Sequence, residues 1–477
     1  MKVYLCNPPT GYYIRDERCQ IDVNSRVAEN IREPIQILYL GGLLQKYDYE
    51  ILIRDYSFSV FSIKNVLSDI LEFKPDCIYI ETTQGTFKGD LKFIDSLVNT
   101  KKDIFFIIKA PFLDEQYLKE QILENNFKSK NKIFFILRSF EITVLEILKN
   151  RGKIVKLDNT FVLNDSEIVT SKGKESVSGF DMDEYPIPPR NFLNKNNYLR
   201  PDTNEPIAYI YTSKGCPQNC IFCSAPLYLG RKVQTRSVDK IIEEVKDCIE
   251  NYKINNFFFR SDSFTFNKKW VMEFCGRVID EKLKINWGAN SRVDVFDEKM
   301  FKTMKNAGCD VVGFGVESCS NEILKKIRKD IRLSDIERIH KLVKQIGIKT
   351  FLHCIIGFPW DNKTTILETK NKLIELNPDF IEVNVPYPLK GTELYEIADK
   401  HELFISKNFE DFSHVNPILR TLYLQPKEIL RMRRDLLFSF YFRKEYIVRK
   451  IKESKSTKVF FNYMKWGLKL TKKMMAR

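Results

Sequence analysis

Short apolar runs alternate with amphipathic stretches through the first 165 residues. The strand-like runs are residues 2–7, 49–56, 76–82, 104–110 and 133–138. Between them, residues 34–47 and 62–73 repeat apolar side chains at the spacing of a helix. Strands that alternate with helices are typical of a parallel sheet covered on both faces. The pattern therefore predicts a doubly wound, mostly parallel α/β sheet over residues 1–165.

The polarity of the chain changes after this region. Residues 153–165 have the pattern of a hairpin, and residues 180–206 hold five prolines among many polar side chains. Proline fixes the backbone and interrupts regular elements, so such a stretch is typical of an ordered connection. We expect a linker over residues 166–204.

A second series of strands and helices follows. Its strand-like runs are residues 207–215, 256–262, 285–291, 311–318, 350–358 and 380–388, and helical patterns such as 238–252 and 335–347 lie between them. Six strand–helix units are fewer than the eight of a closed barrel. We therefore expect a partial (β/α)6 barrel over residues 205–400, followed by a helical, basic C-terminal region over residues 401–477.

The composition narrows the class of protein. An apolar fraction of 43% fits a globular chain, and no run approaches the length of a membrane span. The start of the chain has the pattern of a strand rather than of a signal peptide. Eleven cysteines are scattered without a paired framework. Free cysteines indicate the reducing cytoplasm.

Three of the cysteines form a cluster, GCPQNCIFCS, in which Cys216, Cys220 and Cys223 follow the first strand of the second series. Structural zinc sites use four protein ligands in two close pairs, and no second pair follows here. Cys248 or Cys275 could complete such a site, but both lie in helical patterns. A disulfide is disfavoured by the compartment. Iron–sulfur ligation remains, and three thiolates leave one iron of a [4Fe-4S] cluster open.

The cluster resembles the signature of the radical S-adenosylmethionine (SAM) superfamily, C-x3-C-x2-C with an aromatic residue, here Phe222, before the last cysteine. The resemblance implies that SAM chelates the open iron and is split to a 5′-deoxyadenosyl radical, with the electron coming from an external donor of the flavodoxin or ferredoxin type. Later strand ends resemble the superfamily's SAM-binding motifs. They imply SAM-contacting roles for Asp262, Arg292, Glu317, Ile355, Ile356 and Gly357.

The front end, NPPTGYYIRDERCQ, and the linker resemble a subgroup with an N-terminal cobalamin-binding domain, which includes class B methyltransferases and anaerobic cyclases. The resemblance implies cobalamin at the strand ends of the front sheet. The usual D-x-H-x-x-G motif is absent, and all four histidines lie outside the front domain. The alternative is a front domain that only braces the barrel or binds substrate. The candidate cobalamin residues are Asn7, Thr10, Thr82, Thr83 and Gly85.

The positive charge is concentrated at the C-terminus, where residues 431–477 hold 15 Lys/Arg and three acids. Plotted as a helix, residues 458–477 separate apolar from basic side chains. The apolar side would hold Val459, Phe460, Tyr463, Met464, Trp466, Leu470, Met474 and Met475. Such a helix suits either an anionic membrane surface on the inner face of the membrane or packing on the barrel with a solvated lysine face. Nucleic acid is not expected.

The hypothesis is a radical SAM enzyme, cobalamin-dependent, that methylates an unactivated carbon of a small or lipid-like substrate. Its cluster would be held by Cys216, Cys220 and Cys223, and the sequence identifies no residue that acts on the substrate. One alternative is a radical oxidoreductase or cyclase without methyl transfer. The other is a zinc-containing, membrane-associated binding module.

Overall fold

The chain forms two compact units, which we describe separately: residues 1–23 with 31–194, and residues 24–30 with 195–477. The computed structural model describes residues 1–15, 20–22, 31–58, 62–98, 104–125, 127, 129, 131–138, 140–154, 157, 159–164, 167–171, 180–408, 411, 413–454 and 457–475. The division between the units, after residue 194, falls within the predicted linker.

The first unit is built on a sheet of seven described strands. They are β1 (Lys2–Asn7), β4 (Glu50–Asp55), β5 (Cys77–Glu81), β6 (Phe105–Lys109), β7 (Ile133–Ile136), β8 (Thr160–Asn164) and β9 (Glu167–Ser171). Their order is β4-β1-β5-β6-β7-β8-β9, and the first five are parallel. β5, β6 and β7 are buried along their whole length, as parallel strands covered on both faces must be.

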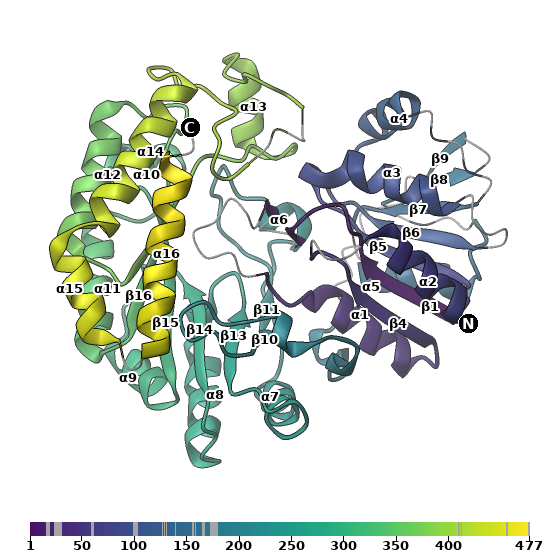
Figure 1. Cartoon of the computed structure of the whole chain (residues 1–477), viewed down its shortest axis with the longest axis horizontal. Helices are drawn as coiled ribbons and strands as arrows, with labels where there is room; N and C mark the ends of the chain where they lie inside the picture. The colour runs from purple at the N-terminus through teal and green to yellow at the C-terminus, as the bar shows by residue number, and fades with distance from the viewer. Residues whose placement is uncertain are drawn as a thin grey trace. The chain divides into compact units, whose positions relative to one another are not determined.

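Helices cover both faces of this sheet (Figure 1). They are α1 (Ile35–Lys46), α2 (Ile63–Phe73), α3 (Phe87–Val98), α4 (Glu115–Glu124) and α5 (Phe140–Lys149). One apolar core joins the sheet to α1 and α5, and a second joins it to α2, α3 and α4. The predicted doubly wound fold is confirmed.

The connecting segment departs in detail from the expectation. The hairpin is formed by β8 and β9, antiparallel at the sheet edge. β8 lies within the predicted range 153–165, but its partner β9 lies in the segment assigned to the linker. The described remainder, 180–204, holds three 3-10 turns, η3 (Met182–Glu184), η4 (Arg190–Phe192) and η5 (Lys195–Asn197). A small antiparallel pair, β2 (Tyr13–Arg15) and β3 (Gln20–Asp22), follows β1 in the first unit.

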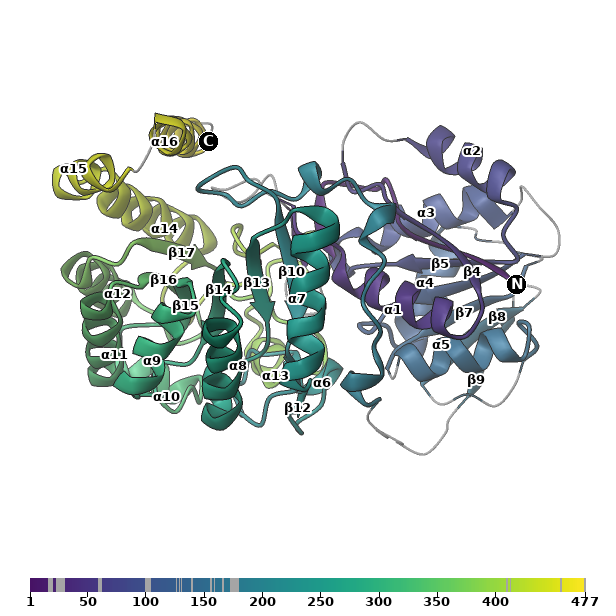
Figure 2. The ribbon, with the colours of Figure 1, turned by 90° about the horizontal axis from the view of Figure 1, so that it is seen from below.

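The second unit contains a parallel sheet of six described strands in sequence order (Figure 2). They are β10 (Ile207–Tyr211), β13 (Asn256–Arg260), β14 (Asn286–Ser291), β15 (Cys309–Glu317), β16 (Lys349–Ile355) and β17 (Phe380–Asn384). A short hairpin, β11 (Ser213–Lys214) with β12 (Gln234–Thr235), follows β10. Because each strand pairs with the next along the chain, the sheet is the predicted partial barrel.

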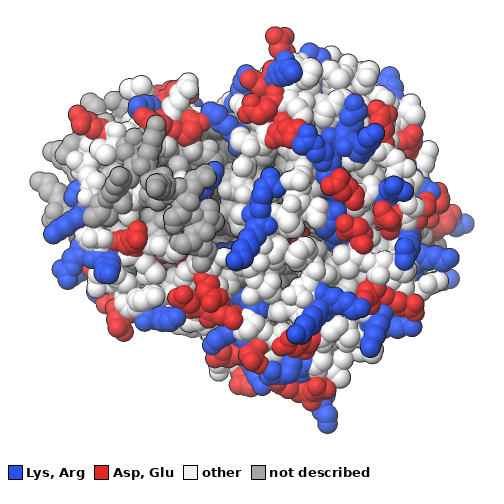
Figure 3. Space-filling model, turned by 180° about the vertical axis from the view of Figure 1, so that it is seen from behind, with Lys and Arg blue, Asp and Glu red and all other residues white. Residues whose placement is uncertain are grey.

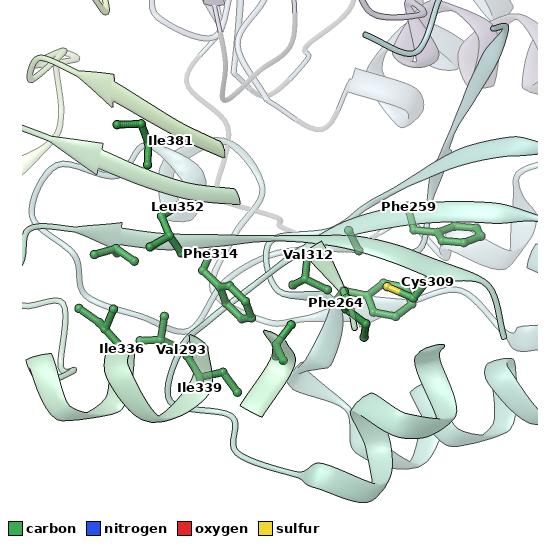
Figure 4. Close-up of a cluster of buried hydrophobic side chains, with 14 of the residues drawn as sticks. Phe259, Phe264, Val293, Cys309, Val312, Phe314, Ile336, Ile339, Leu352 and Ile381 are labelled. Atoms are coloured by element: carbon green, nitrogen blue, oxygen red, sulfur yellow. The ribbon is translucent and has the colours of Figure 1, made fainter. Parts of the chain in front are cut away.

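Helices follow the strands of this sheet. They are α6 (Ala225–Tyr228), α7 (Val238–Tyr252), α8 (Lys268–Asp280), α9 (Glu298–Asn306), α10 (Asn321–Lys326), α11 (Leu333–Ile346), α12 (Lys363–Leu376) and α13 (Glu393–Lys400). Val312 and Phe314 of β15 join the core with Ile336 and Ile339 of α11 (Figure 4). The alternate residues Gly313 and Gly315 therefore face the inside of the barrel, since successive side chains of a strand point to opposite faces.

Two C-terminal helices, α14 (Pro426–Tyr441) and α15 (Lys444–Glu453), pack beside the last strand. The Tyr441 hydroxyl accepts a hydrogen bond from the Ile381 N–H (2.9 Å) and donates one to its carbonyl (2.6 Å). Arg433 donates to the carbonyl of Val383 (2.7 Å). Side chains of α14 thus occupy backbone groups along the outer edge of β17.

Part of the basic C-terminal charge has a structural role. Arg443 donates to the carbonyl of Ile374 in α12, and Arg449 donates to the carbonyls of Asn377 and Pro378 just beyond it. Cations at a helix C-terminus satisfy its last carbonyls and complement the helix dipole. These arginines join α15 to the end of α12.

The last helix, α16 (Thr457–Met475), packs on the barrel through one side. Asn462 bonds the carbonyl of Asp202 (3.1 Å), the Tyr463 ring contacts Phe380, and Leu470 is buried. Met464, which we expected on the apolar side with these residues, instead faces outward. It forms an exposed row with Phe461 and Leu468, with 51%, 66% and 62% of each residue accessible. The side chains of Met474 and Met475 lie outside the described part.

Charges of both signs are interspersed over the face shown in Figure 3. In the described part of the chain, no helix combines the length and the apolar composition needed to cross a bilayer.

Candidate functional site

The cysteine loop begins with a backbone conformation that requires glycine. Gly215 has φ +97°, and a Cβ there would lie 2.2 Å from the carbonyl oxygen of Lys232. The chain can pass this point only without a side chain. Next to it, the Cys216 N–H donates to the carbonyl of Gly230 (3.1 Å), so the β11–β12 hairpin supports the first cysteine.

The other side of the loop is held by two more backbone hydrogen bonds. The Ile221 N–H donates to the carbonyl of Ile327 (3.2 Å), and the Leu394 N–H donates to the carbonyl of Ile221 (2.9 Å). Of the ten cysteines that the structure describes, only Cys216, Cys220 and Cys223 are partly accessible. No set of three His, Cys, Asp or Glu side chains among the described residues is arranged to hold a single metal ion.

The electrostatics of the loop depend on two cations that also lie at this site. Burial raises the pKa of the Cys220 thiol to about 11, and the positive charges of Lys329 and Arg292 act in the opposite direction. A thiol must lose its proton to ligate a metal, and a bound metal cation lowers its pKa. Lys329 and Arg292 therefore favour the thiolate form of Cys220, which is the form that ligates a metal.

Glu317 ends β15 in a backbone conformation that is rare for a residue other than glycine, with φ +64°. The pairing of β15 with β16 shifts register between Gly315 and Glu317. Such irregularities redirect a side chain at the end of a strand. Here the carboxylate lies 2.7 Å from the Lys329 ammonium, and both side chains are almost completely buried.

Lys329 was not among the predicted site residues. It follows α10 in a loop, and a lysine after a helix is ordinarily solvated, so its sequence position gives no signal. The structure shows its connection to the site. Burial acts to lower the pKa of Lys329, but attraction to Glu317 and Cys220 outweighs burial and raises it. Gly315 makes room for the pair, because a Cβ there would lie 2.7 Å from Glu317 Oε1 and 3.0 Å from Lys329 Nζ.

Arg292 follows β14 and is held by Asp294, with its shortest contact at 2.8 Å. It also donates to the carbonyl of Lys329 (3.0 Å). Burial acts to lower the pKa of Arg292, but Asp294, Cys220 and Cys216 raise it and outweigh burial. The structure therefore brings Arg292 and Glu317 together with the cysteines, and adds Lys329.

Asp262 lies in the loop after β13, between Ser261 and Ser263, which are both buried. The hydroxyl groups of these two serines have no hydrogen-bond partner within the described residues. Buried hydroxyl groups are almost always hydrogen-bonded. This strand end therefore offers hydroxyl groups, which can donate or accept, to a polar ligand.

At the end of β16, the N–H groups of the predicted adenine-contacting segment already have partners. The Ile356 N–H donates to the carbonyl of Asn384 (2.9 Å), and the Gly357 N–H donates to the Asp361 carboxylate (2.8 Å). Ile355 is half-buried, so its side chain is accessible from the inner face of the barrel.

The same carboxylate fixes the next residue of this turn. Asp361 also accepts from the Phe358 N–H (3.0 Å), and its burial raises its pKa to about 6. The Phe358 ring lies 5.5 Å from the ring of Phe222, measured between centroids. Asp361 thereby couples the end of β16 to the cysteine motif.

The inner face of the barrel carries a polar pair that the sequence did not identify. His353 Nδ1 lies 3.1 Å from the Glu382 carboxylate, on neighbouring strands. His353 Nε2 is buried and has no hydrogen-bond partner within the described residues. Only the pairing register of β16 and β17 places these two side chains together.

In the first unit, the five candidate cobalamin residues lie at the carboxyl ends of β1 and β5 or directly after them. In chain order these are the first and third parallel strands of a 2-1-3-4-5 sheet, and the order of connection reverses between them. Ligands of open α/β sheets bind in the crevice at such a switch point. The candidates are Asn7, Thr10, Thr82, Thr83 and Gly85.

A buried polar network shapes this edge. Arg15 pairs with Asp90 (2.9 Å), and both side chains are inaccessible. Thr10 and Thr86 bond to the same pair, and Thr83 bonds to Thr86 (2.8 Å). These threonine hydroxyls therefore serve the domain itself, and the sequence did not identify Arg15 or Asp90.

Asn7 and Thr82 are engaged in the same way, Asn7 with Asp55 (3.1 Å) and Thr82 with the carbonyl of Lys109 (2.7 Å). A Cβ at Gly85 would lie 2.9 Å from the Tyr13 hydroxyl, so a side chain there would force Tyr13 to move. This end of the sheet is therefore preformed. Because its polar side chains are already hydrogen-bonded, a ligand would contact its backbone and the Tyr13 ring.

Residues 210–373 match the family model described as the Radical SAM superfamily, a range that includes the three cysteines and every candidate SAM residue. The chain contains a radical SAM domain. Proteins with this domain are enzymes, and the domain implies a [4Fe-4S] cluster and SAM.

Two curated relatives match this chain over most of its length, in both units. "Uncharacterized methyltransferase PH0819" of Pyrococcus horikoshii is 27% identical over 95% of both chains. The anaerobic magnesium-protoporphyrin IX monomethyl ester cyclase of Rubrivivax gelatinosus is 24% identical over 83% of this chain and 71% of its own.

Two solved structures share the fold of both units. The cobalamin-dependent SAM radical enzyme OxsB matches 99% of this chain and 71% of its own, with a TM-score of 0.74 and 15% identity. The radical SAM methyltransferase TsrM of Kitasatospora setae matches 100% of this chain and 99% of its own, with a TM-score of 0.68 and 13% identity. The predicted pairing of a Rossmann-like unit with a radical SAM barrel is confirmed.

Proposed function

We propose that the protein is a cobalamin-dependent radical SAM methyltransferase that transfers a methyl group to an unactivated carbon. One observation carries this: a three-cysteine loop after β10 and a topological switch point between β1 and β5 occur in one chain. Relatives named as methyltransferases and the fold shared with OxsB and TsrM support methyl transfer over cyclisation.

The residues of the second unit fit a cluster and SAM. Cys216, Cys220 and Cys223 would hold three irons, since these residues are partly accessible in a loop fixed by backbone hydrogen bonds. Lys329 is the buried cation suited to the SAM carboxylate. Asp262, with the two serine hydroxyls beside it, suits the SAM amino group.

The remaining residues would orient SAM. Glu317 fixes Lys329, Arg292 is fixed by Asp294, and the turn after β16 is held by Asp361. Ile355, Ile356 and Gly357 would then contact adenine through apolar surface and through carbonyls, because their described N–H partners are already supplied. Rigid positioning of this kind lowers the entropic cost of reaching a reactive geometry.

When bound, the cluster supplies the electron that splits SAM, and cobalamin supplies the methyl group that is transferred. The protein's own part is to bind, orient and exclude water. Cobalamin would lie at the carboxyl ends of β1 and β5, where Gly85 lets the Tyr13 hydroxyl approach the backbone and the Arg15–Asp90 network keeps the edge rigid. The substrate would lie against the inner face of the barrel, where His353 is held by Glu382.

The proposed function can be tested in two steps: the cluster with SAM cleavage first, and cobalamin binding second. Protein reconstituted anaerobically with iron and sulfide should hold about four irons per chain and should form 5′-deoxyadenosine from SAM after reduction. Alanine at Cys216, Cys220 or Cys223 should abolish both. Alanine at Cys275, a buried thiol of α8, is the matched control and should retain both.

Hydroxocobalamin added during reconstitution should remain bound at one per chain after gel filtration. Iron without retained cobalamin would favour a radical oxidoreductase, and one zinc per chain without iron would overturn the radical SAM function.

We also propose that the protein works in the reducing cytoplasm and that α16 touches an anionic membrane surface there. The supporting observation is the exposed row Phe461, Met464 and Leu468, beside the exposed Lys465 and Lys472. Apolar side chains flanked by lysines favour the interface of anionic lipids. The protein should sediment with phosphatidylglycerol vesicles at low salt, and serine at all three apolar positions should abolish this. Equal sedimentation of the variant would contradict the membrane contact.

A further inference from the structure

The cysteine loop reaches the molecular surface. Pro217 and Asn219, which lie between Cys216 and Cys220, are exposed, although the cysteines themselves are only partly accessible. A redox centre held by this loop would therefore be separated from solvent by very little protein. Any protein that delivers an electron to it over a short path must approach this surface.

Exposed cations flank the loop on both sides. Arg231 and Lys232 directly follow Gly230, whose carbonyl accepts from the Cys216 N–H (3.1 Å). Lys325 and Lys326 directly precede Ile327, whose carbonyl accepts from the Ile221 N–H (3.2 Å). Each pair is thus attached to the loop through one backbone hydrogen bond. Figure 2 shows β12, α6 and α10 along the same side of this unit.

These four cations form no ion pair with the described residues. None of them has a carboxylate partner within the described residues: Arg231 bonds the Asn219 side chain (2.6 Å), and Lys326 lies over the Trp360 ring. Nearby Arg328 differs, since it makes two hydrogen bonds of 2.7 Å to Glu393. The unpaired charges therefore project an attractive potential for a negatively charged partner.

We propose that Arg231, Lys232, Lys325 and Lys326 form a docking surface for an acidic one-electron donor protein. We call this set the cationic rim. The inference rests on the proposed function, because it requires a cluster in the cysteine loop. In the step itself, the donor's reduced cofactor loses one electron and the oxidised cluster gains it, and no covalent bond changes.

The physical role of the rim is to speed and orient the encounter. Complementary charges raise association rates and make them sensitive to ionic strength, while contributing less to the lifetime of the complex. Arg231 is also braced by the loop itself through Asn219, so its charge stays beside the cysteines.

The experiment uses a flavodoxin in its hydroquinone form as the donor and follows reduction of the reconstituted cluster by stopped flow. Charge reversal in R231E/K232E or in K325E/K326E should slow reduction about tenfold at low salt and flatten its dependence on ionic strength. Reduction by dithionite, which needs no protein docking, should stay within twofold of the wild type. The matched control, K465E/K472E on α16, changes the same number of charges outside the rim and should leave the flavodoxin rate unchanged.

A second measurement needs no cluster. Binding of the same flavodoxin to the purified protein should weaken about tenfold in either rim variant, and not in the α16 variant. Equal binding and equal rates in the rim variants, or an equal loss in the α16 variant, would overturn the docking surface. Failure to take up iron would instead overturn the proposed function, and the binding measurement would still decide whether the rim docks an acidic protein.

Discussion

The ammonium of Lys329 lies 2.7 Å from the carboxylate of Glu317, and the two charges are buried together at the end of β15. A buried pair is stable only while both members are present, because an unpaired charge keeps its full desolvation cost. The pair therefore links the rigidity of this edge, where we propose that SAM binds, to the stability of the whole barrel.

Methionine at Lys329 should lower the free energy of unfolding by about 3–5 kcal/mol, since it leaves the Glu317 carboxylate buried without its cation. The double variant K329M/E317Q should recover most of that loss. Urea unfolding of the metal-free protein measures both. Equal destabilisation of the single and double variants would show that packing, and not charge, accounts for the effect.

Asp361 should make stability depend on pH in a defined window. Its pKa rises from 3.8 in the unfolded chain to about 6 in the folded protein, because burial outweighs the hydrogen bonds from Thr365, Gly357 and Phe358. Between about pH 4 and pH 6 the folded state keeps a proton that the unfolded state has released. The stability that the protonated Asp361 contributes therefore falls as pH rises from about 4 to about 6, and it no longer changes above that window.

Asparagine at Asp361 removes the titration while keeping a similar shape. Relative to the wild type, D361N should gain stability steadily from pH 4 to pH 6 and show a constant difference from pH 7 to pH 8. Thermal unfolding at each pH measures the difference. A difference that does not vary with pH would mean that this carboxyl does not titrate in the window.

Alanine at Gly215 should disrupt the cysteine loop, because the added Cβ would lie 2.2 Å from a backbone oxygen at a left-handed φ. We expect a lower melting temperature and less than half of the wild-type iron. Gly276 in α8 is the matched control, since no heavy atom lies within 4 Å of a Cβ there. G276A should gain about 0.5–1 kcal/mol of stability and keep its iron.

Methionine at Arg15 should damage the front unit by leaving Asp90 buried without its cation, at a cost of about 3–5 kcal/mol. Retention of hydroxocobalamin should be lost with it. Arg54, which pairs with Asp69 in a partly exposed position, is the control, and R54M should cost about 1 kcal/mol or less. Full retention by R15M would separate the network from the cobalamin crevice.

Periodicity was sufficient to predict the parallel strands of both sheets, because strands covered on both faces read as continuous apolar runs. It could not place the hairpin at β8 and β9, where polar residues at the sheet edge give a weaker signal. The pairs that organise the sites, Glu317 with Lys329 and His353 with Glu382, join residues that only the tertiary fold brings together.

The last helix shows a further limit of sequence patterns. The sequence predicted that α16 is amphipathic, but its rotation about its own axis is set by contacts with Asp202 and Phe380. Those contacts turn Met464 outward, away from the side where periodicity alone placed it.

The open barrel ends at β17, and an unprotected edge strand is a template for pairing with other chains. Tyr441 occupies the outward N–H and C=O groups of Ile381, and Arg433 occupies the carbonyl of Val383, so α14 protects that edge. A chain shortened before Pro426 would expose these groups as a ready partner for another strand. Its characteristic failure would therefore be edge-to-edge self-association, even with every strand of the barrel still present.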